Sequence, residues 1–214
     1  MKRIIIIGGM GPQASLELHR RIIKRAVENG AKDGGDFPHI VHFSFPIDDF
    51  ISDKSKTAKA VKFIVQELSS FRFRAMDEII LACNTAHLFQ HKLEQALGIQ
   101  ISSLIDATAQ HIEKLNLTEV KLLASPTTVN SGLYSSALEK RGIGVVLPKS
   151  DELSDVETII RSVIAGRPVR AATVSEQPVL LGCTELSCAF AGQPNVIDPM
   201  DIIIDEIMPR VEVI

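Results

Sequence analysis

The chain has 214 residues, of which 45% are hydrophobic and 23% are charged, and its formal net charge at pH 7 is −3. This composition is typical of a globular protein with a substantial core, in one large domain or two small ones. The slight negative charge, the lack of a basic run and the scarcity of aromatic residues, with no Trp and one Tyr, argue against nucleic acid and against an anionic membrane as partners.

The N-terminus lacks the pattern of a secretory signal. Its apolar run extends only from Ile4 to Ile7 and is interrupted by Gly8, Gly9 and Pro12. No apolar stretch approaches the roughly 18 residues that a membrane-spanning helix needs. The odd number of cysteines, three, fits a reducing compartment in which thiols are reactive groups or core residues. We therefore expect a cytoplasmic protein.

Short apolar runs alternate with amphipathic segments along the chain. The apolar runs predict strands at 3–8, 39–45, 77–82, 99–102, 119–124, 144–147, 178–182 and 195–198. The amphipathic segments predict helices at 14–30, 56–71, 85–98, 107–115, 131–142, 154–166, 184–192 and from about 199, with Pro209 ending or kinking the last one. Uniformly apolar strands separated by helices are typical of parallel sheets that are covered on both faces.

One long-range repetition stands out in this α/β pattern. A strand, a cysteine, polar residues and a helix follow one another at Cys83 and again at Cys183. This predicts two pseudo-symmetric α/β domains, residues 1–98 with 193–214 and residues 99–192, each a mainly parallel sheet flanked by helices. Sheets of this kind bind ligands beyond the carboxyl ends of their strands, so we expect the active site in the cleft between the domains.

The glycine-rich segment "GGMGPQAS" (8–15) follows the first predicted strand. Gly9, Gly11 and Ala14 match the dinucleotide fingerprint, but that fingerprint also requires an acidic residue at the end of the second strand. The first candidate here, Asp48, lies beyond Pro46. We therefore expect no nucleotide cofactor, and backbone N–H groups that face a smaller anion such as a carboxylate.

Cys83 and Cys183 are the strongest candidates for chemistry. A single cysteine beside an apolar run is usually a core residue. Here both cysteines stand at the predicted carboxyl end of a strand and before a helix, whose N-terminus favours the thiolate and is expected to lower the thiol pKa. Polar neighbours follow each one, Asn84 and Thr85 in the first case and Thr184 and Glu185 in the second.

The remaining cysteine, one histidine and two threonines are weaker candidates for functional residues. Cys188 is expected in the core, and no metal site is predicted because no histidine lies near Cys183 and Cys188. His87 is close enough to the start of its helix to orient or polarise Cys83. In the loop 122–132, Thr127 or Thr128 can donate a hydrogen bond to a carboxylate.

Taken in order, five segments resemble the cofactor-independent aspartate/glutamate racemases, and within them the aspartate racemase branch. They are "IGGMGPQAS" near the N-terminus, "ACNTAH" at 82–87, "LLASPTTVNSGLY" at 122–134, "GCTELS" at 182–187 and "VIDPMD" at 196–201. The resemblance covers most of the chain and implies an isomerase without cofactor or metal, a small amino-acid substrate and a homodimer.

The resemblance also implies roles for individual residues. Cys83 and Cys183 correspond to the two catalytic thiols, one acting as base on one face of Cα while the other acts as acid on the opposite face. The implied substrate-binding residues are Met10, Gly11, Asn84, Thr85, Thr128, Thr184 and Glu185.

Two departures from the family pattern concern the substrate's side chain. Phe50 stands at or near the family's arginine, and Ser154 stands where the family has a lysine. The possible substitutes for these charges are Lys54, Lys149, Arg167 and Arg170. Two alternatives to an amino-acid racemase therefore remain, a related cysteine-dependent enzyme of the hydantoin racemase, maleate isomerase or decarboxylase type, and a non-catalytic small-molecule binding protein.

Overall fold

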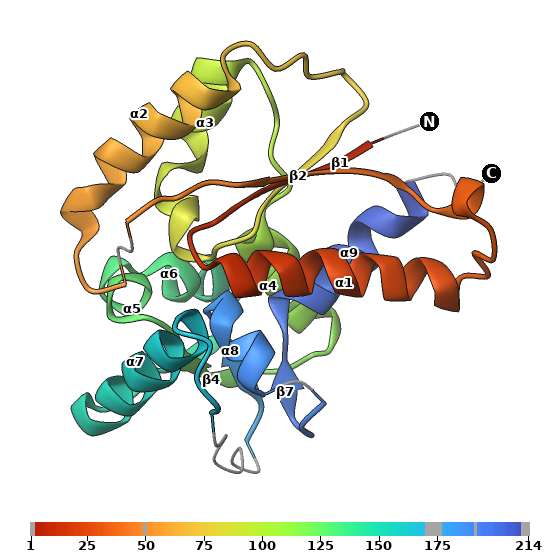
Figure 1. Cartoon of the computed structure of the whole chain (residues 1–214). Helices are drawn as coiled ribbons and strands as arrows, with labels where there is room; N and C mark the ends of the chain where they lie inside the picture. The colour runs from red at the N-terminus through yellow and green to blue at the C-terminus, as the bar shows by residue number, and fades with distance from the viewer. Residues whose placement is uncertain (1–2, 49–50, 170–176, 191, 211–214) are drawn as a thin grey trace.

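A computed structural model describes residues 3–48, 51–169, 177–190 and 192–210 of the chain (Figure 1). Its strands form two parallel sheets. The first has the order β2-β1-β3 and consists of β1 (Arg3–Gly8), β2 (His39–Ser44) and β3 (Glu78–Leu81). The second has the order β5-β4-β6-β7 and consists of β4 (Glu119–Leu123), β5 (Gly144–Val146), β6 (Val179–Leu181) and β7 (Val196–Ile197).

The two sheets share one topology. In each, the strand that comes first along the chain lies at the centre, with the next strand on one side and the third on the other. The order β5-β4-β6 therefore repeats β2-β1-β3, and β7 extends the second sheet. This confirms the predicted α/β class with two similar sheets. It also makes the loop after β3 equivalent to the loop after β6.

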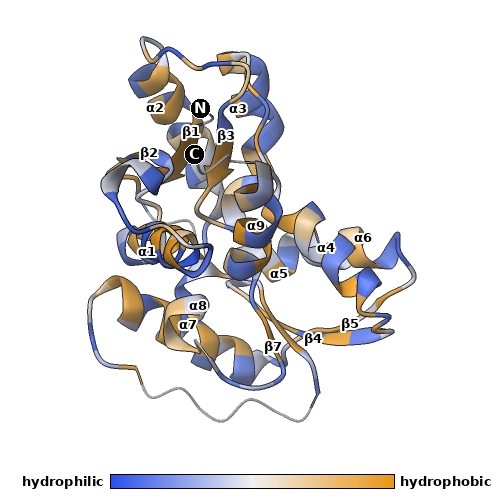
Figure 2. Ribbon diagram, turned by 90° about the vertical axis from the view of Figure 1, so that its right-hand side faces the viewer, coloured by the Kyte–Doolittle hydropathy of each residue, from blue (hydrophilic) through white to orange (hydrophobic). Residues whose placement is uncertain are grey.

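Helices cover both faces of both sheets. The helices α2 (Thr57–Leu68) and α3 (Gln90–Leu97) cover the outer face of the first sheet. The helices α1 (Pro12–Glu28), α4 (Leu104–Lys114) and α9 (Pro199–Ile207) lie between the sheets (Figures 1 and 2). The remaining helices, α5 (Pro126–Ser131), α6 (Leu133–Glu139), α7 (Ser150–Ile164) and α8 (Thr184–Ala189), belong to the second sheet's side of the molecule. Among the described residues, no helix has both the length and the apolarity to cross a membrane.

The central strand β1 shows why this layering forms. Its isoleucines are completely buried, and β-branched side chains favour extended backbone. Because side chains alternate along a strand, Ile4 and Ile6 pack with α1 and α9 whereas Ile5 and Ile7 pack with α2 and α3. The apolar cluster around Ile4 and Ile6 continues to Leu122 of β4, so one core connects the two sheets.

Several predicted boundaries shift for local reasons. The helix expected from 107 begins at Leu104 because the Ser103 side chain accepts a hydrogen bond from the Asp106 N–H and caps it. The helix expected at 131–142 is the shorter α6, and the loop expected before it contains the additional helix α5, which ends at Gly132, whose φ of 68° is left-handed. The strand expected at 99–102 is reduced to a single bridge between Ser102 and Ile80.

Candidate active site

Cys83 and Cys183 lie at equivalent ends of the two sheets. Cys83 follows the carboxyl end of β3, and Cys183 follows the carboxyl end of β6. Both side chains are buried, with 7% and 6% of their surface exposed. The Thr184 hydroxyl donates a hydrogen bond to the Ala82 carbonyl oxygen at 3.4 Å, so the residues next to the two thiols are in contact. The pKa of Cys183 is raised by burial, then by Glu185, and also by the charge that Cys83 can carry.

The carboxyl group of Glu185 lies beside Cys183. The Cys183 Sγ donates a hydrogen bond of 2.9 Å to Glu185 Oε2, and the Thr184 hydroxyl approaches the same oxygen at 3.4 Å. The other oxygen, Oε1, is buried and has no hydrogen-bond partner among the described residues. Burial raises the pKa of Glu185 because the charged form loses its hydration.

Gly11 makes room for this carboxyl group. A Cβ atom at residue 11 would lie 1.6 Å from Glu185 Oε1, so any other residue would force the buried carboxyl group to move. Gly9 has a φ of +92°, and a Cβ there would lie 2.1 Å from the Phe45 carbonyl oxygen. Close packing therefore accounts for the glycine motif that resembled a nucleotide fingerprint. Met10, between these glycines, is buried in the same apolar cluster as Cys83.

The thiols do not have the lowered pKa values that their place before helices predicted. The Thr85 and Ala86 backbone N–H groups and the Thr85 side chain do favour the Cys83 thiolate. Burial and the nearby Glu185 outweigh them and raise the pKa of Cys83 to about 12. The prediction was wrong because it considered the helix ends and omitted the loss of hydration.

The segment after Cys83 is joined to the second half of the chain by side-chain hydrogen bonds. Asn84 Oδ1 accepts a hydrogen bond from the Tyr134 hydroxyl at 2.5 Å, while its Nδ2 is buried without a partner in the described part of the chain. The Thr85 hydroxyl lies 2.8 Å from that of Thr128 and 3.2 Å from that of Ser125. Thr128 is therefore engaged in this buried hydroxyl cluster.

His87 supports the backbone of the Cys83 segment, and none of its hydrogen bonds within the described part of the chain goes to the Cys83 thiol. Its Nδ1 hydrogen-bonds to the carbonyl oxygens of Cys83 at 3.0 Å and Asn84 at 3.1 Å, and its Nε2 accepts from the Leu104 N–H at 3.0 Å. These partners define the neutral tautomer with the proton on Nδ1. Burial lowers the pKa of His87 to about 4.

The loop after β2 reaches the second half of the molecule. Ile51 packs in the apolar cluster that contains Cys183, and its carbonyl oxygen accepts a hydrogen bond from the Thr127 N–H at 2.9 Å. Phe50 and Arg170 lie outside the described residues, as does the side chain of Lys54. Of the other residues discussed for substrate charge, Lys149, Ser154 and Arg167 are exposed.

Sequence reasoning did not find Tyr134, Ser125 or Ile51. Tyr134 and Ser125 are completely buried, and each completes a polar cluster begun by a residue from the other half. Ser125 carried one usable signal, because Ser before Pro at the end of a strand is a typical helix N-cap. Nothing in the sequence pairs Tyr134 with Asn84.

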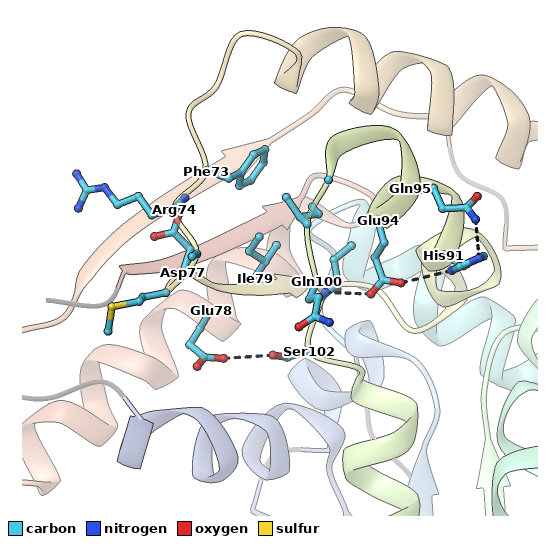
Figure 3. A pocket seen from close by; sticks show the side chains of 15 residues that line it. Phe73, Arg74, Asp77, Glu78, Ile79, His91, Glu94, Gln95, Gln100 and Ser102 are labelled. Atoms are coloured by element: carbon cyan, nitrogen blue, oxygen red, sulfur yellow. Dashed lines mark hydrogen bonds and ion pairs between the residues drawn. The ribbon is translucent and has the colours of Figure 1, made fainter.

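A separate hollow of about 1140 Å³ lies at the opposite end of β3 (Figure 3). It is bounded by the segment that leads into β3 and by residues 98–102. Two of its acidic side chains already have partners. Glu94 accepts hydrogen bonds from Gln90 and the Ile101 N–H, and Glu78 accepts one from Ser102. Because Cys83 follows the other end of β3, this hollow is distinct from the thiol site.

The fold is an α/β fold with two equivalent sheets, and in each sheet a buried thiol follows the carboxyl end of one strand. Such an arrangement is suited to acid–base or nucleophilic chemistry. The Asp/Glu/Hydantoin racemase family model matches residues 7–207, and the chain belongs to this family.

Individual relatives agree with that assignment. An aspartate racemase homologue from Pyrococcus horikoshii has a TM-score of 0.73 at 25% identity, with 98% of each chain covered. The aspartate racemase of Picrophilus torridus has a TM-score of 0.69 at 25% identity, covering 98% of this chain and 94% of that one. The broad specificity amino-acid racemase RacX of Bacillus subtilis is 26% identical over 142 residues, which are 66% of this chain and 62% of RacX.

The clash at Gly11 predicts the effect of adding one methyl group. Gly11→Ala should displace the Glu185 carboxyl group and lower the free energy of unfolding by about 1–3 kcal/mol, as overpacking does elsewhere. Chemical denaturation measures this. Gly34→Ala is the matched control, because a Cβ there meets nothing within 4 Å. Equal stability of the two variants would contradict the proposed close approach.

The lowered pKa of His87 predicts a loss of stability in acid. Unfolded chains take up a proton at this residue below about pH 6.5, whereas the folded protein resists until about pH 4. Stability should therefore fall as the pH is lowered from 6.5 to 4, by up to about 3 kcal/mol from this residue.

Urea denaturation of His87→Gln tests the sign and size of this effect. The variant should be less stable at neutral pH and should lose the His87 part of the pH dependence. His91→Gln, at an exposed histidine of α3, should keep the full dependence. An unchanged pH slope in His87→Gln would show that another group is responsible.

Proposed function

We propose that the protein is a cofactor-independent amino-acid racemase in which Cys83 and Cys183 act on opposite faces of one Cα atom. The pair of buried thiols at equivalent strand ends carries this proposal. Racemisation requires removal of a proton from one face and delivery of another to the opposite face. Two thiols from two related halves are suited to that task.

Two buried polar atoms without partners support an amino acid as the substrate. Glu185 Oε1 is an acceptor and Asn84 Nδ2 is a donor, and a buried polar group without a hydrogen bond costs about 1–3 kcal/mol. An α-ammonium group would satisfy Glu185, and an α-carboxylate would satisfy Asn84. Hydantoin and maleate lack the ammonium group, so this pair favours amino acids over the substrates of those related enzymes.

The raised thiol pKa values fit activation by the substrate itself. In the free protein, burial and Glu185 keep both thiols protonated. A bound ammonium group would neutralise Glu185, so that one thiol would lose its proton to solvent as the substrate binds and become a thiolate. That thiolate takes the Cα proton, the resulting carbanion is stabilised by hydrogen bonds to the carboxylate, and the opposite thiol donates its proton to the other face. The reverse reaction exchanges the two roles.

The substrate's side chain is proposed from the relatives. The names of two structural relatives point to aspartate, whereas RacX is named for broad specificity. Aspartate and glutamate are therefore the first substrates to test, and neutral amino acids belong in the same panel.

Replacement of either site cysteine should greatly slow racemisation. Cys83→Ser and Cys183→Ser should each reduce the rate about 10²- to 10⁴-fold, because a hydroxyl is a much poorer acid and base than a thiol at neutral pH. Circular dichroism of each enantiomer, supplied separately, measures the rate. Cys188→Ser is the control, since Cys188 packs against the apolar core and its Sγ hydrogen-bonds only weakly to the Thr184 carbonyl.

Other outcomes would select other functions. A single variant that racemises at the full rate would rule out the two-base mechanism. Turnover of hydantoins or maleate, with no amino acid racemised, would favour the related enzymes. Thermal stabilisation by an amino acid without any turnover would favour a binding protein.

A further inference from the structure

A buried arginine in the middle of α1 is hydrogen-bonded to the backbone of α8, the helix that carries Glu185. Arg21 is only 8% exposed, and its guanidinium uses all three nitrogens. Its Nη2 donates to the carbonyl oxygen of Ser187 in α8 at 2.8 Å, and its Nη1 donates to Asp198 at 2.7 Å. Its Nε donates to Glu17 at 2.8 Å, which fixes the orientation of the group.

Ser187 and Asp198 complete the connection. The Ser187 hydroxyl donates to Asp198 Oδ1 at 2.7 Å, and the same oxygen caps α9 by accepting from the Met200 N–H at 2.9 Å. Arg21, Ser187 and Asp198, hereafter the Arg21 clamp, therefore tie α8 to α1 and to the start of α9 by one closed set of hydrogen bonds.

The clamp lies close to the candidate chemistry. Cys183 is the N-cap residue of α8, Glu185 is in its first turn and Ser187 follows two residues later. The helix spans only Thr184–Ala189 and has no side-chain cap, and a helix this short is not stable without tertiary contacts. The start of α1 also meets α8 at Gly11, opposite Glu185. Helix α1 therefore contacts α8 at two points, one at the carboxyl group and one at the clamp.

The energetics of buried ion pairs indicate a geometric role. Taking an arginine and an aspartate out of water costs about as much as their attraction returns, so well-packed apolar residues would often be as stable. A charged, hydrogen-bonded group defines the relative positions of the elements that it joins more narrowly than apolar packing does. Here the elements are α1 of the first half and α8 of the second.

We propose that Arg21 and Asp198 are positioning residues that hold α8 so that the Cys183 thiol and Glu185 face the substrate opposite Cys83. This proposal rests on the proposed racemase function. Neither residue takes part in the proton transfers. Loosening the clamp should disturb Cys183 selectively, because Cys83 is held by a separate set of contacts around Thr85, Ser125 and His87.

The test compares two arginines of the same helix. Arg21→Met removes the clamp. Arg25→Met also removes an arginine that joins α1 to α9, through Asp205, but Arg25 makes no hydrogen bond or ion pair to α8 among the contacts of the described residues. Alkylation of the folded proteins by iodoacetamide, followed by mass spectrometry, gives separate rates for Cys183 and Cys83. This readout does not depend on activity.

In Arg21→Met the ratio of the Cys183 rate to the Cys83 rate should rise at least about tenfold, because local opening exposes one thiol only. In Arg25→Met the ratio should match the wild type. The same ratio in Arg21→Met as in Arg25→Met would overturn the proposal. Ser187→Ala, which removes one hydroxyl from the clamp, should raise the ratio in the same direction and serves if Arg21→Met does not fold.

A second readout links the clamp to the reaction. When each enantiomer is incubated in D2O, the clamp variant should introduce deuterium into one recovered enantiomer only, the one whose Cα–H faces Cys83. That thiol can remove and return a proton while Cys183 fails to deliver one. If the variant racemised both enantiomers more slowly and to the same degree, and neither recovered enantiomer gained deuterium in preference to the other, the clamp would serve stability alone. Failure of the wild type to label any amino acid would instead count against the racemase function, and the alkylation ratio would still test the clamp.

Discussion

The buried carboxyl group of Glu185 constrains most of the candidate site. One of its oxygens accepts a hydrogen bond from the Cys183 thiol, and the other lies in the interior without a partner among the described residues. Its presence accounts for glycine at position 11, and its charge contributes to the raised pKa values of both site cysteines. A buried carboxyl group is costly unless a donor or a cation meets it. A ligand with an ammonium group would supply the cation and hydrogen-bond donor that Glu185 Oε1 lacks among the described residues.

The repeated topology explains how two thiols from distant parts of the sequence occupy equivalent positions in the two sheets. β3 and β6 occupy the same position in their sheets, so the loops that follow them are related by the pseudo-symmetry of the fold. The environments are similar but unequal. Cys183 has a carboxyl neighbour in its own helix, whereas Cys83 is surrounded by backbone N–H groups and hydroxyls. The proposed reaction needs both thiols, and this inequality allows each to be followed separately.

The sequence was informative where local pattern determines structure. The four isoleucines of β1 and the cysteines after two strands led directly to the alternating elements and to the thiol pair. It was uninformative where the deciding contact joins distant segments. Tyr134 meets Asn84, Arg21 meets Ser187, and His87 meets the Leu104 N–H across many intervening residues. The thiol pKa was predicted in the wrong direction for the same reason, because burial depends on the whole fold.

The central claim is that two opposed thiols act on one amino acid, and the position of solvent deuterium tests it most directly. The wild-type protein is incubated in D2O with one enantiomer of a substrate identified from the panel, and both enantiomers are separated and examined by mass spectrometry at low conversion. A two-thiol mechanism predicts deuterium at Cα in the product enantiomer, with almost none in the recovered substrate, because the group that donates the new proton differs from the group that removed the old one. Deuterium appearing equally fast in the recovered substrate would show that one group serves both faces, and would contradict the paired roles assigned to Cys83 and Cys183.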